Sequence, residues 1–537
     1  MNKKTLIKWG IGGAAAVLVL MIALVIPYYL GIKAEQSLKQ QYELLANTSF
    51  LSVEKHEYRR GWFSSSETTV LRFKSTFLAT VQQRLPENVR KILQEPITLQ
   101  GNVRHGLFAG SLKPVRARID TDVQFTPEVK RTLTRFFEQQ TPIQLRNTLS
   151  LTGGGQWEIN MPAFDYEELS GIKLVWQGLQ SKANYDADFQ SYDIHTQSPG
   201  LKLTLADFGE MSYQGLDINT HTEHGQNGLA LGNSRVSLKQ LDAQWGDGVN
   251  YDIRLNELIN MVSELQIGAF INPVGSVPPG KIVVEDLSFA THMQESGEWI
   301  NSNGSFEFGK LRYGSDEYGP LVIDAAAEHL QAKSLLALKN KLLELSAQKM
   351  PEEKMRVALI QAAREQGLGL FTHNPVFKLN QFHLQMPQGV VAAHGSLALT
   401  GLEAADLHDA RSIVRKTDAV FDLQIPDKLL ETMAIGQMRN LISIAPGEDS
   451  DAIQADLDET IRLMVSSTIR VLVQDGYITS DKNLIKTTIQ VKDNRLLLNG
   501  KPFEREAETN AWENESDTAS MPKTQSNAAS AVSAGDK

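Results

Sequence analysis

The chain has 537 residues, enough for one large domain or for two to three ordinary ones. It contains no cysteine, which excludes disulfides, thiolate metal sites and thiol nucleophiles. The formal net charge is −10, and the acidic residues are spread along the chain. This argues against a nucleic-acid partner, because phosphate binding requires a basic face.

The chain begins with an apolar stretch. Residues 9–32 carry no charged side chain and exceed the roughly 20 residues that span a bilayer as a helix. The positive charges before it are Lys3, Lys4 and Lys8. Positive charge stays on the cytoplasmic side of a membrane, so we expect a cytoplasmic segment over 1–8 and a transmembrane anchor over 9–32. A retained anchor is favoured over a cleaved signal peptide because no small-x-small site follows.

A helical stalk and a duplicated β unit are predicted next. Apolar residues at helical spacing indicate the stalk over residues 33–48. Within 49–145, the segments Arg60–Ser66 and His105–Ser111 share the pattern basic-Gly-apolar-Phe-small-small-Ser, and alternating β sequence follows each. These two turns are either binding loops or glycine-enabled turns whose aromatic rings lie in the core, and the second interpretation is favoured. Helix-forming sequence lies between the copies, around 85–94.

The following region, 146–400, is predicted to be an extended β-rich body. A helix with Thr126 as its cap and Pro127 at its first position precedes it. Gly153-Gly154-Gly155 is interpreted as a hairpin turn rather than a phosphate loop. Four short apolar-polar-polar-apolar units suggest successive meanders of a long antiparallel sheet. They are Leu205–Phe208, Leu238–Leu241, Val284–Leu287 and Leu379–Phe382.

Helices interrupt this sheet at 255–265 and 332–347. The second carries a leucine seam, which is either a coiled-coil contact between chains or a face packed on the sheet; packing on the sheet is favoured because the pattern spans only about two heptads. The seam consists of Leu335, Leu338, Leu342 and Leu345.

The C-terminal part is predicted to be a β hairpin over 377–399, then a helical segment and a last hairpin within 401–503. Apolar residues recur every four positions from Ile453 to Val473, which predicts a long amphipathic helix. Residues 504–537 have almost no large apolar side chain and are expected to be disordered. The expected fold class is therefore α+β: a single N-terminal transmembrane helix, a large, mainly antiparallel β-meander body with interspersed amphipathic helices, and a disordered acidic tail.

The chain shows no catalytic signature. His221 and His224 form the only close histidine pair, but three-residue spacing brings two ligands together only on a helix, and a strand or loop is favoured here. Asp186 and Asp188 resemble many acidic pairs on exposed strands. We therefore expect no catalytic, cofactor-binding or metal-binding residues, no cofactor and no enzymatic activity.

The assembled motifs resemble one family. Tyr58–Ser65, His105–Phe108, Gly476–Ile478 and Leu496–Pro502 look like the YdgA-like family of Gram-negative bacterial proteins of unknown function, domain of unknown function 945. The resemblance covers residues 1 to about 503. It implies a single-pass inner-membrane anchor with a periplasmic body in the cell envelope. The layout is also similar to that of AsmA-like envelope proteins, which pair an anchor with a long β groove that conducts lipid.

Two functions are expected from this layout. The first is a non-enzymatic, inner-membrane-anchored envelope protein that binds or conducts lipid or another amphiphile along an elongated β groove. The alternative is an interaction scaffold, a homodimer formed through the leucine seam or through Leu38 to Leu45 of the stalk. A hydrolase with a site assembled from dispersed residues is the least favoured.

Overall fold

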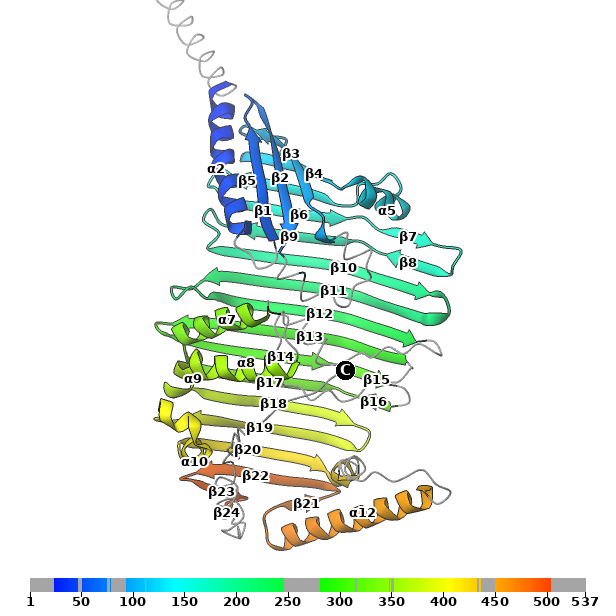
Figure 1. The fold of residues 1–537 in the computed structure, drawn as a ribbon, viewed down its shortest axis with the longest axis vertical. Coiled ribbons are helices and arrows are strands. Elements are labelled where there is room, and N and C mark those ends of the chain that lie inside the picture. The colour runs from blue at the N-terminus through cyan, green and yellow to red at the C-terminus, as the bar shows by residue number, and fades with distance from the viewer. Residues whose placement is uncertain are drawn as a thin grey trace, which may run out of the picture.

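The computed structural model describes residues 24–46, 51–74, 78, 93–111, 113–245, 281–313, 316–346, 348, 352–431, 434–435 and 450–503. All 24 strands within these residues belong to one sheet, and the strands follow one another along the long axis of the molecule (Figure 1). Every pairing between the described strands is antiparallel.

The strands of the first half are β1 (Leu51–Arg59), β2 (Ser64–Phe73), β3 (Ile97–His105), β4 (Val115–Gln124), β5 (Gln144–Ser150), β6 (Gly155–Met161), β7 (Phe164–Glu167), β8 (Ile172–Trp176), β9 (Leu179–Tyr185), β10 (Ser191–Leu205), β11 (Gly209–His224) and β12 (Ala230–Trp245). Those of the second half are β13 (Lys281–Ser296), β14 (Trp299–Phe308), β15 (Lys310–Tyr313), β16 (Asp316–Tyr318), β17 (Leu321–Gln331), β18 (Val376–Met386), β19 (Gly389–Leu399), β20 (Thr417–Pro426), β21 (Thr479–Asp481), β22 (Leu484–Lys492), β23 (Arg495–Leu498) and β24 (Lys501–Pro502). The helices are α2 (Ile26–Ala46), α5 (Pro127–Phe137), α7 (Ala332–Ser346), α8 (Glu352–Glu365), α9 (Leu368–Thr372), α10 (Ala410–Arg415) and α12 (Ser450–Gln474), with 3₁₀ turns at Ala206–Phe208 and Ala404–His408.

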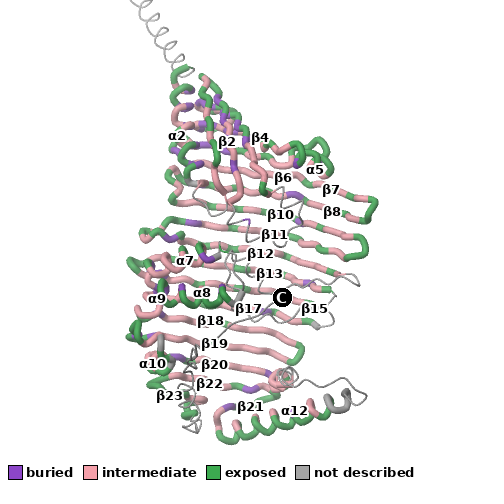
Figure 2. The backbone as a smooth tube through the Cα atoms, in the orientation of Figure 1, coloured by how far each residue is buried: buried purple, intermediate pink, exposed green. Residues whose placement is uncertain are grey.

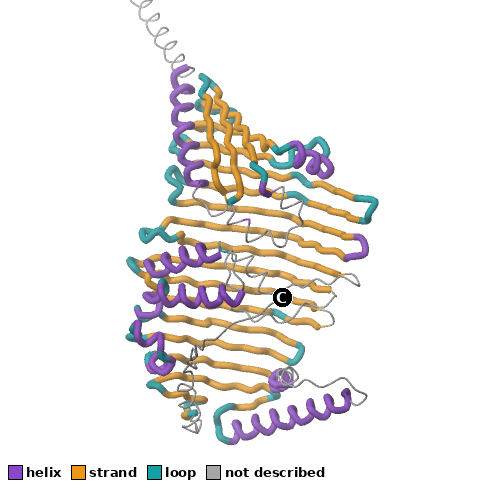
Figure 3. Tube along the Cα trace, in the orientation of Figure 1, coloured by secondary structure: helices purple, strands orange, loops and turns teal. Residues whose placement is uncertain are grey.

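The sheet is mostly a meander, because most strands pair with the strands next to them in the chain. The central order is β9, β10, β11, β12, β13, β14, β17, β18, β19, β20 and β22. Some long strands pair with two shorter strands that lie end to end. The strand β10 pairs with β9 and β8 in this way, and β13 pairs with β14 and β15. The elongated shape follows from this addition of one hairpin after another (Figure 3).

Buried residues gather in a few places, whereas most of the sheet is half-buried (Figure 2). The first cluster lies under α2, where Leu38 and Tyr42 pack against the β3, β4 and β5 strands, including Ile119 and Leu149. A second cluster lies under α7 and α9, around Ile300 of β14. A third joins α7 to α8. Helices therefore provide the cores of a sheet that is only one layer thick.

Several predicted elements are confirmed. Thr126 caps α5, whose first residue is Pro127, by accepting a hydrogen bond from Val129 N at 3.5 Å. Gly153 and Gly154 lie in the hairpin turn between β5 and β6, and Gly155 is the first residue of β6. The predicted long helix is α12, and the two C-terminal hairpins are β18–β19 and β22–β23. The predicted helix over 332–347 is α7, and its leucines pack within the chain, against the sheet and α8.

The predicted stalk is a helix, but it does not stand apart from the body. Residues 33–46 belong to α2, in which Ala34 and Leu38 are fully buried against the sheet. The sequence also gave no indication of α8 and α9, which extend the layer begun by α7. The predicted helix at 255–265, residues 1–8, residues 85–92 and the tail at 504–537 lie outside the described residues.

The predicted fold class, α+β with a single N-terminal transmembrane helix, is wrong. The molecule is mostly an antiparallel β-sheet with a few helices, and none of the helices within the described residues combines the length and apolar character required to cross a bilayer. Of the expected anchor, residues 9–23 lie outside the described residues, and residues 26–32 form the beginning of α2. The single-pass inner-membrane localisation depended on that helix and is corrected with it, since the described structure does not support such a topology.

Candidate functional site

An uninterrupted row of apolar side chains crosses the centre of the sheet. Residues that pair directly across antiparallel strands lie on the same face, so the pairing registers of the strands define the row. We call this row the apolar track; it consists of Ile218, Val236, Phe289, Phe306, Ile323, Phe382, Ala393 and Leu423, on β11, β12, β13, β14, β17, β18, β19 and β20. Eight strands about 4.8 Å apart give it a length of about 34 Å.

The adjacent row faces the other side of the sheet and is mainly polar. Neighbouring residues along a strand point to opposite faces, so each track residue is followed or preceded by one on the far face. The far-face row is Asp217, Ser237, Ser288, Glu307, Val322, His383, Ala392, Gln424 and Lys486. The sheet is therefore amphipathic, with one apolar and one polar face.

Helices border the apolar face. Met293, Ala327 and Phe377 lie on the same face as the track, nearer one end of their strands, and they pack against the cluster under α7 and α9. Figure 1 shows α7 and α8 across that end of the strands only. At the centre of the track the side chains remain accessible, since Phe289 is 45% and Phe306 38% exposed. Contiguous exposed apolar side chains, unlike single ones, are typical of interaction surfaces.

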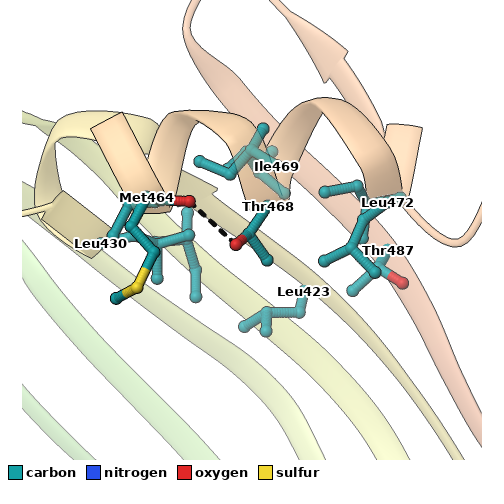
Figure 4. A pocket seen from close by; sticks show the side chains of 11 residues that line it. Leu423, Leu430, Met464, Thr468, Ile469, Leu472 and Thr487 are labelled. Atoms are coloured by element: carbon teal, nitrogen blue, oxygen red, sulfur yellow. Dashed lines mark hydrogen bonds between the residues drawn. The ribbon is translucent and has the colours of Figure 1, made fainter. Parts of the chain in front are cut away.

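The track leads into a cavity beneath α12, which we call the α12 pocket (Figure 4). Its volume is about 340 Å³. Leu423, the last residue of the track, forms part of its floor. The remaining lining residues are Ile425, Leu430, Met464, Val465, Thr468, Ile469, Leu472, Ile478, Ile485 and Thr487.

The polar atoms in the α12 pocket are already bonded. Thr468 donates its hydroxyl to Met464 O at 2.8 Å, and Thr487 donates to Tyr477 O at 3.1 Å. Each hydroxyl therefore uses its proton on a backbone carbonyl. The cavity presents hydrocarbon to a ligand, and a polar group placed in it would lose its bonds to water.

A second cavity, of about 360 Å³, lies on the polar face of β19, β20 and β22. Asp422 accepts a hydrogen bond from the Thr488 hydroxyl at 2.5 Å and lies 3.2 Å from Nε2 of His394. The side chain of His394 is exposed and that of Asp422 is about half exposed, so this pair is a solvated surface contact.

A buried polar cluster holds α2 on the sheet. Gln41 Nε2 donates to the Tyr185 hydroxyl at 2.9 Å, Tyr185 donates to Asn147 Oδ1 at 2.6 Å, and Asn147 Nδ2 donates back to Gln41 Oε1 at 2.8 Å. The three side chains form a closed ring of hydrogen bonds, each at most 7% exposed. Burial raises the pKa of the Tyr185 hydroxyl, so it remains a donor.

Glu67 of β2 is a buried carboxyl group beside this ring. It is 3% exposed and accepts a hydrogen bond from the Tyr42 hydroxyl at 3.3 Å. Burial raises its pKa to about 7, although the Tyr42 hydrogen bond acts in the opposite direction. Its side chain lies over Gly101, where an added Cβ would be 2.5 Å from Glu67 Cγ. Gly101 pairs with Glu67 on one side and with Thr121 on the other. Two side-chain oxygens here are buried without a hydrogen-bond partner, Thr121 Oγ1 and Glu67 Oε2.

The two glycine-aromatic turns close the hairpins β1–β2 and β3–β4 and lie side by side, joined by a bond from His105 N to Phe63 O. The expectation that their aromatic rings lie in the core is wrong, because Trp62, Phe63 and Phe108 are each more than half exposed. Trp62 instead donates its Nε1 to Leu24 O at the beginning of the described chain, at 2.9 Å.

His105 connects these turns to α2. Its Nδ1 lies 2.8 Å from Pro27 O, so this nitrogen carries the proton, and its Nε2 accepts from the Ser65 hydroxyl at 3.0 Å. Burial lowers its pKa, which favours the neutral ring that this arrangement requires. The imidazole also fills the space beside Gly31, since a Cβ there would be 2.8 Å from the ring. The contact fixes the path of α2 over the sheet.

The remaining sequence candidates are not brought together into a site. His221 and His224 lie on β11, one of the two alternatives predicted, a strand or a loop, and His221 is paired with Asp193 at 2.7 Å and Glu223 at 3.1 Å. These carboxylates raise its pKa. Asp186 accepts from Gln190 N at 2.8 Å and stabilises the β9–β10 turn. Among the described residues, no three metal-binding side chains converge.

Fold and site together define a class: an elongated, single-layered antiparallel sheet whose apolar face is bordered by helices and ends in an apolar pocket. The chain belongs to a family described as bacterial protein of unknown function, DUF945, whose family model matches residues 3–506. This confirms the resemblance found in the sequence. The searches of curated proteins and of solved structures gave no match.

Proposed function

We propose that this protein binds an amphiphile with a long hydrocarbon chain, without converting it, along the apolar track. The observation that carries the proposal is the row of directly paired apolar residues across eight strands, with Phe289 and Phe306 accessible at its centre. Burying such side chains against hydrocarbon is favourable by about 25 cal/mol per Å² of apolar surface.

The dimensions support a chain-like ligand. A bilayer's hydrocarbon core is about 30 Å thick, so one acyl chain accounts for about 15 Å. A track of about 34 Å is therefore long enough for an extended chain of this kind. A second apolar row beside the track widens the surface, with Phe308, Leu321, Leu384 and Val391 paired across β14, β17, β18 and β19.

Hydroxyl groups border the track on its other side. Thr220 Oγ1 and Ser234 Oγ lie 3.0 Å apart on the face of the track, two residues from Ile218 and Val236 along β11 and β12, and Ser234 pairs with Thr291. Such groups can bond to the polar part of an amphiphile while its chain lies on the apolar residues.

The alternative, a homodimeric scaffold, has lost its expected surfaces. Leu335 and Leu338 of α7 pack against the cluster around Ile300, and Leu38 of α2 is fully buried against the sheet. These leucines pack within one chain, so they do not offer the contact surfaces that a dimer through them would require.

The test uses delipidated protein titrated with cis-parinaric acid, a fluorescent fatty acid. Phe289→Asp places a carboxylate in the track and should raise Kd at least tenfold, which is about 1.4 kcal/mol. The matched control is Val420→Asp, because Val420 is 37% exposed on the polar face of β20. Saturable binding that Phe289→Asp weakens and Val420→Asp does not would support the proposal. Absence of saturable binding, or equal effects of the two substitutions, would refute it.

A further inference from the structure

We infer that the α12 pocket receives the methyl end of the hydrocarbon chain and thereby limits the length of chain that the protein binds. This inference rests on the proposed function, because it assigns the end of the same ligand. It names a site that the track alone does not define: a cavity formed jointly by α12, β20 and β22.

The apolar track and the α12 pocket are continuous. Leu423 pairs with Ala393 of the track and also lines the α12 pocket. Its partner on the other side, Thr487 of β22, lines the pocket as well. A chain lying along the track towards β20 therefore meets the cavity without crossing a polar surface.

The chemistry of the pocket lining determines which end of the ligand can enter. The pocket hydroxyls of Thr468 and Thr487 are bonded to backbone carbonyls, so the lining offers no free hydrogen-bond donor to a carboxylate or other head group. Burying a charged head group there would be strongly unfavourable. The hydrocarbon end must enter the pocket, and the head group must lie at the other end of the ligand.

The α12 pocket has the size of a ligand site and a flexible side chain at its rim. A cavity of about 340 Å³ lies within the range of about 300–1,000 Å³ that is typical of ligand sites. Met464, at its rim, is 55% exposed and has the flexible, polarizable side chain that adjusts to hydrocarbon of different shapes. On α12, Ile461 is buried, and Val465 and Ile469 follow it at four-residue spacing on the face towards the cavity.

The first experiment compares saturated fatty acids from octanoate to stearate as competitors of cis-parinaric acid. Each additional buried methylene should lower Kd about fourfold. Val465→Phe fills the pocket and should weaken stearate binding at least tenfold while leaving octanoate unchanged. Ile469→Phe is a second, independent filling variant. Ser467→Phe adds the same ring at an exposed position of α12 and serves as the control.

The second measurement needs no substitution. A fatty acid with a photoreactive diazirine at its methyl end is crosslinked to the wild-type protein, and the labelled peptides are identified by mass spectrometry. Labels within α12 or within 484–487 are expected. Labels confined to β11–β14 would overturn the inference.

The outcomes separate the two proposals. If Phe289→Asp weakens all chain lengths but Val465→Phe and Ile469→Phe keep the wild-type length dependence, the pocket inference fails and the proposed function stands. If the filling variants abolish binding and Phe289→Asp has no effect, the pocket alone holds the ligand and the proposed function fails. If the wild-type protein binds no fatty acid, both are refuted.

Discussion

The buried carboxyl group of Glu67 gives the protein a pH dependence whose size follows from the structure. With a pKa of 4.5 in the unfolded chain and about 7 in the folded state, Glu67 binds its proton more tightly when α2 is docked. Its stabilising contribution is therefore fully present below pH 4.5 and is lost as pH rises through 7. The penalty reaches about 3 kcal/mol at pH 8 and stays below about 1 kcal/mol at pH 5.

Glu67→Gln should remove this dependence, because the amide has the shape of the protonated acid and does not ionise. Hydrogen–deuterium exchange of the α2 amides reports the free energy of α2 opening. At pH 8 the variant should be more protected than the wild type by about 3 kcal/mol, and at pH 5 the two should differ by less than about 1 kcal/mol. Glu43→Gln, on the same helix with a side chain that is 66% exposed, is the control.

Equal protection of the variant and the wild type at both pH values would refute this reasoning. It would show that Glu67 is not desolvated by α2. A decrease in protection at pH 8 would be equally contrary, because it would mean that the charged carboxylate stabilises the docked helix.

Three further outcomes are expected. Gly101→Ala should lower stability by about 1–3 kcal/mol by overpacking against Glu67, and adding Glu67→Ala should restore part of the loss; thermal unfolding of single and double variants checks this. Tyr185→Phe opens the ring of hydrogen bonds and leaves the Asn147 carbonyl without its donor, so the melting temperature should fall by the equivalent of about 1–3 kcal/mol. Thr126→Ala removes the cap of α5 and should cost about 1 kcal/mol, seen as faster exchange in α5 and unchanged exchange in α2.

Elements with a strong local signal could be predicted from the sequence. The capped start at Thr126, the four-residue recurrence from Ile453 to Val473 and the last hairpin each depend on neighbouring residues only. Asp493 and Asn494 take left-handed conformations, with φ of 50° and 61°, as their residue types allow. Local patterns of this kind determine most of the hairpins in the sheet.

The short apolar-polar-polar-apolar units had a cause that the sequence did not reveal. Leu379 and Phe382 flank a register shift between β18 and β19, and Asp286, within Val284–Leu287, has a φ of 54°. A three-residue apolar spacing in a strand is typical of such irregularities, because a bulge changes the alternation of faces. The pattern therefore marks kinks in the sheet as well as its repetition.

The candidate site could be predicted only in part. An apolar face was expected, but the alignment of Phe289 with Phe306, and of Leu423 with the α12 pocket, depends on the registers of strands distant in the sequence. The burial of the Glu67 carboxyl group had a local signal. Glu67 lies at every second position of β2 with Ser65, Thr69 and Leu71, on one face of the strand, and all of them are buried. The hydrogen-bonded ring joins Gln41 to Asn147 and Tyr185, which are more than a hundred positions away in the sequence, and left no local signal.

Because of the meander connectivity, the length of the apolar track changes in whole steps when hairpins are gained or lost. Because most strands pair with their neighbours in sequence, as β10, β11, β12 and β13 do, the loss or gain of one hairpin leaves all other pairings intact. Each such event changes the sheet by two strand spacings, about 10 Å. Members of the family that differ by whole hairpins would thus present apolar tracks of different lengths above the same terminal pocket, and under the proposed function the number of hairpins would set the length of hydrocarbon chain that each one binds.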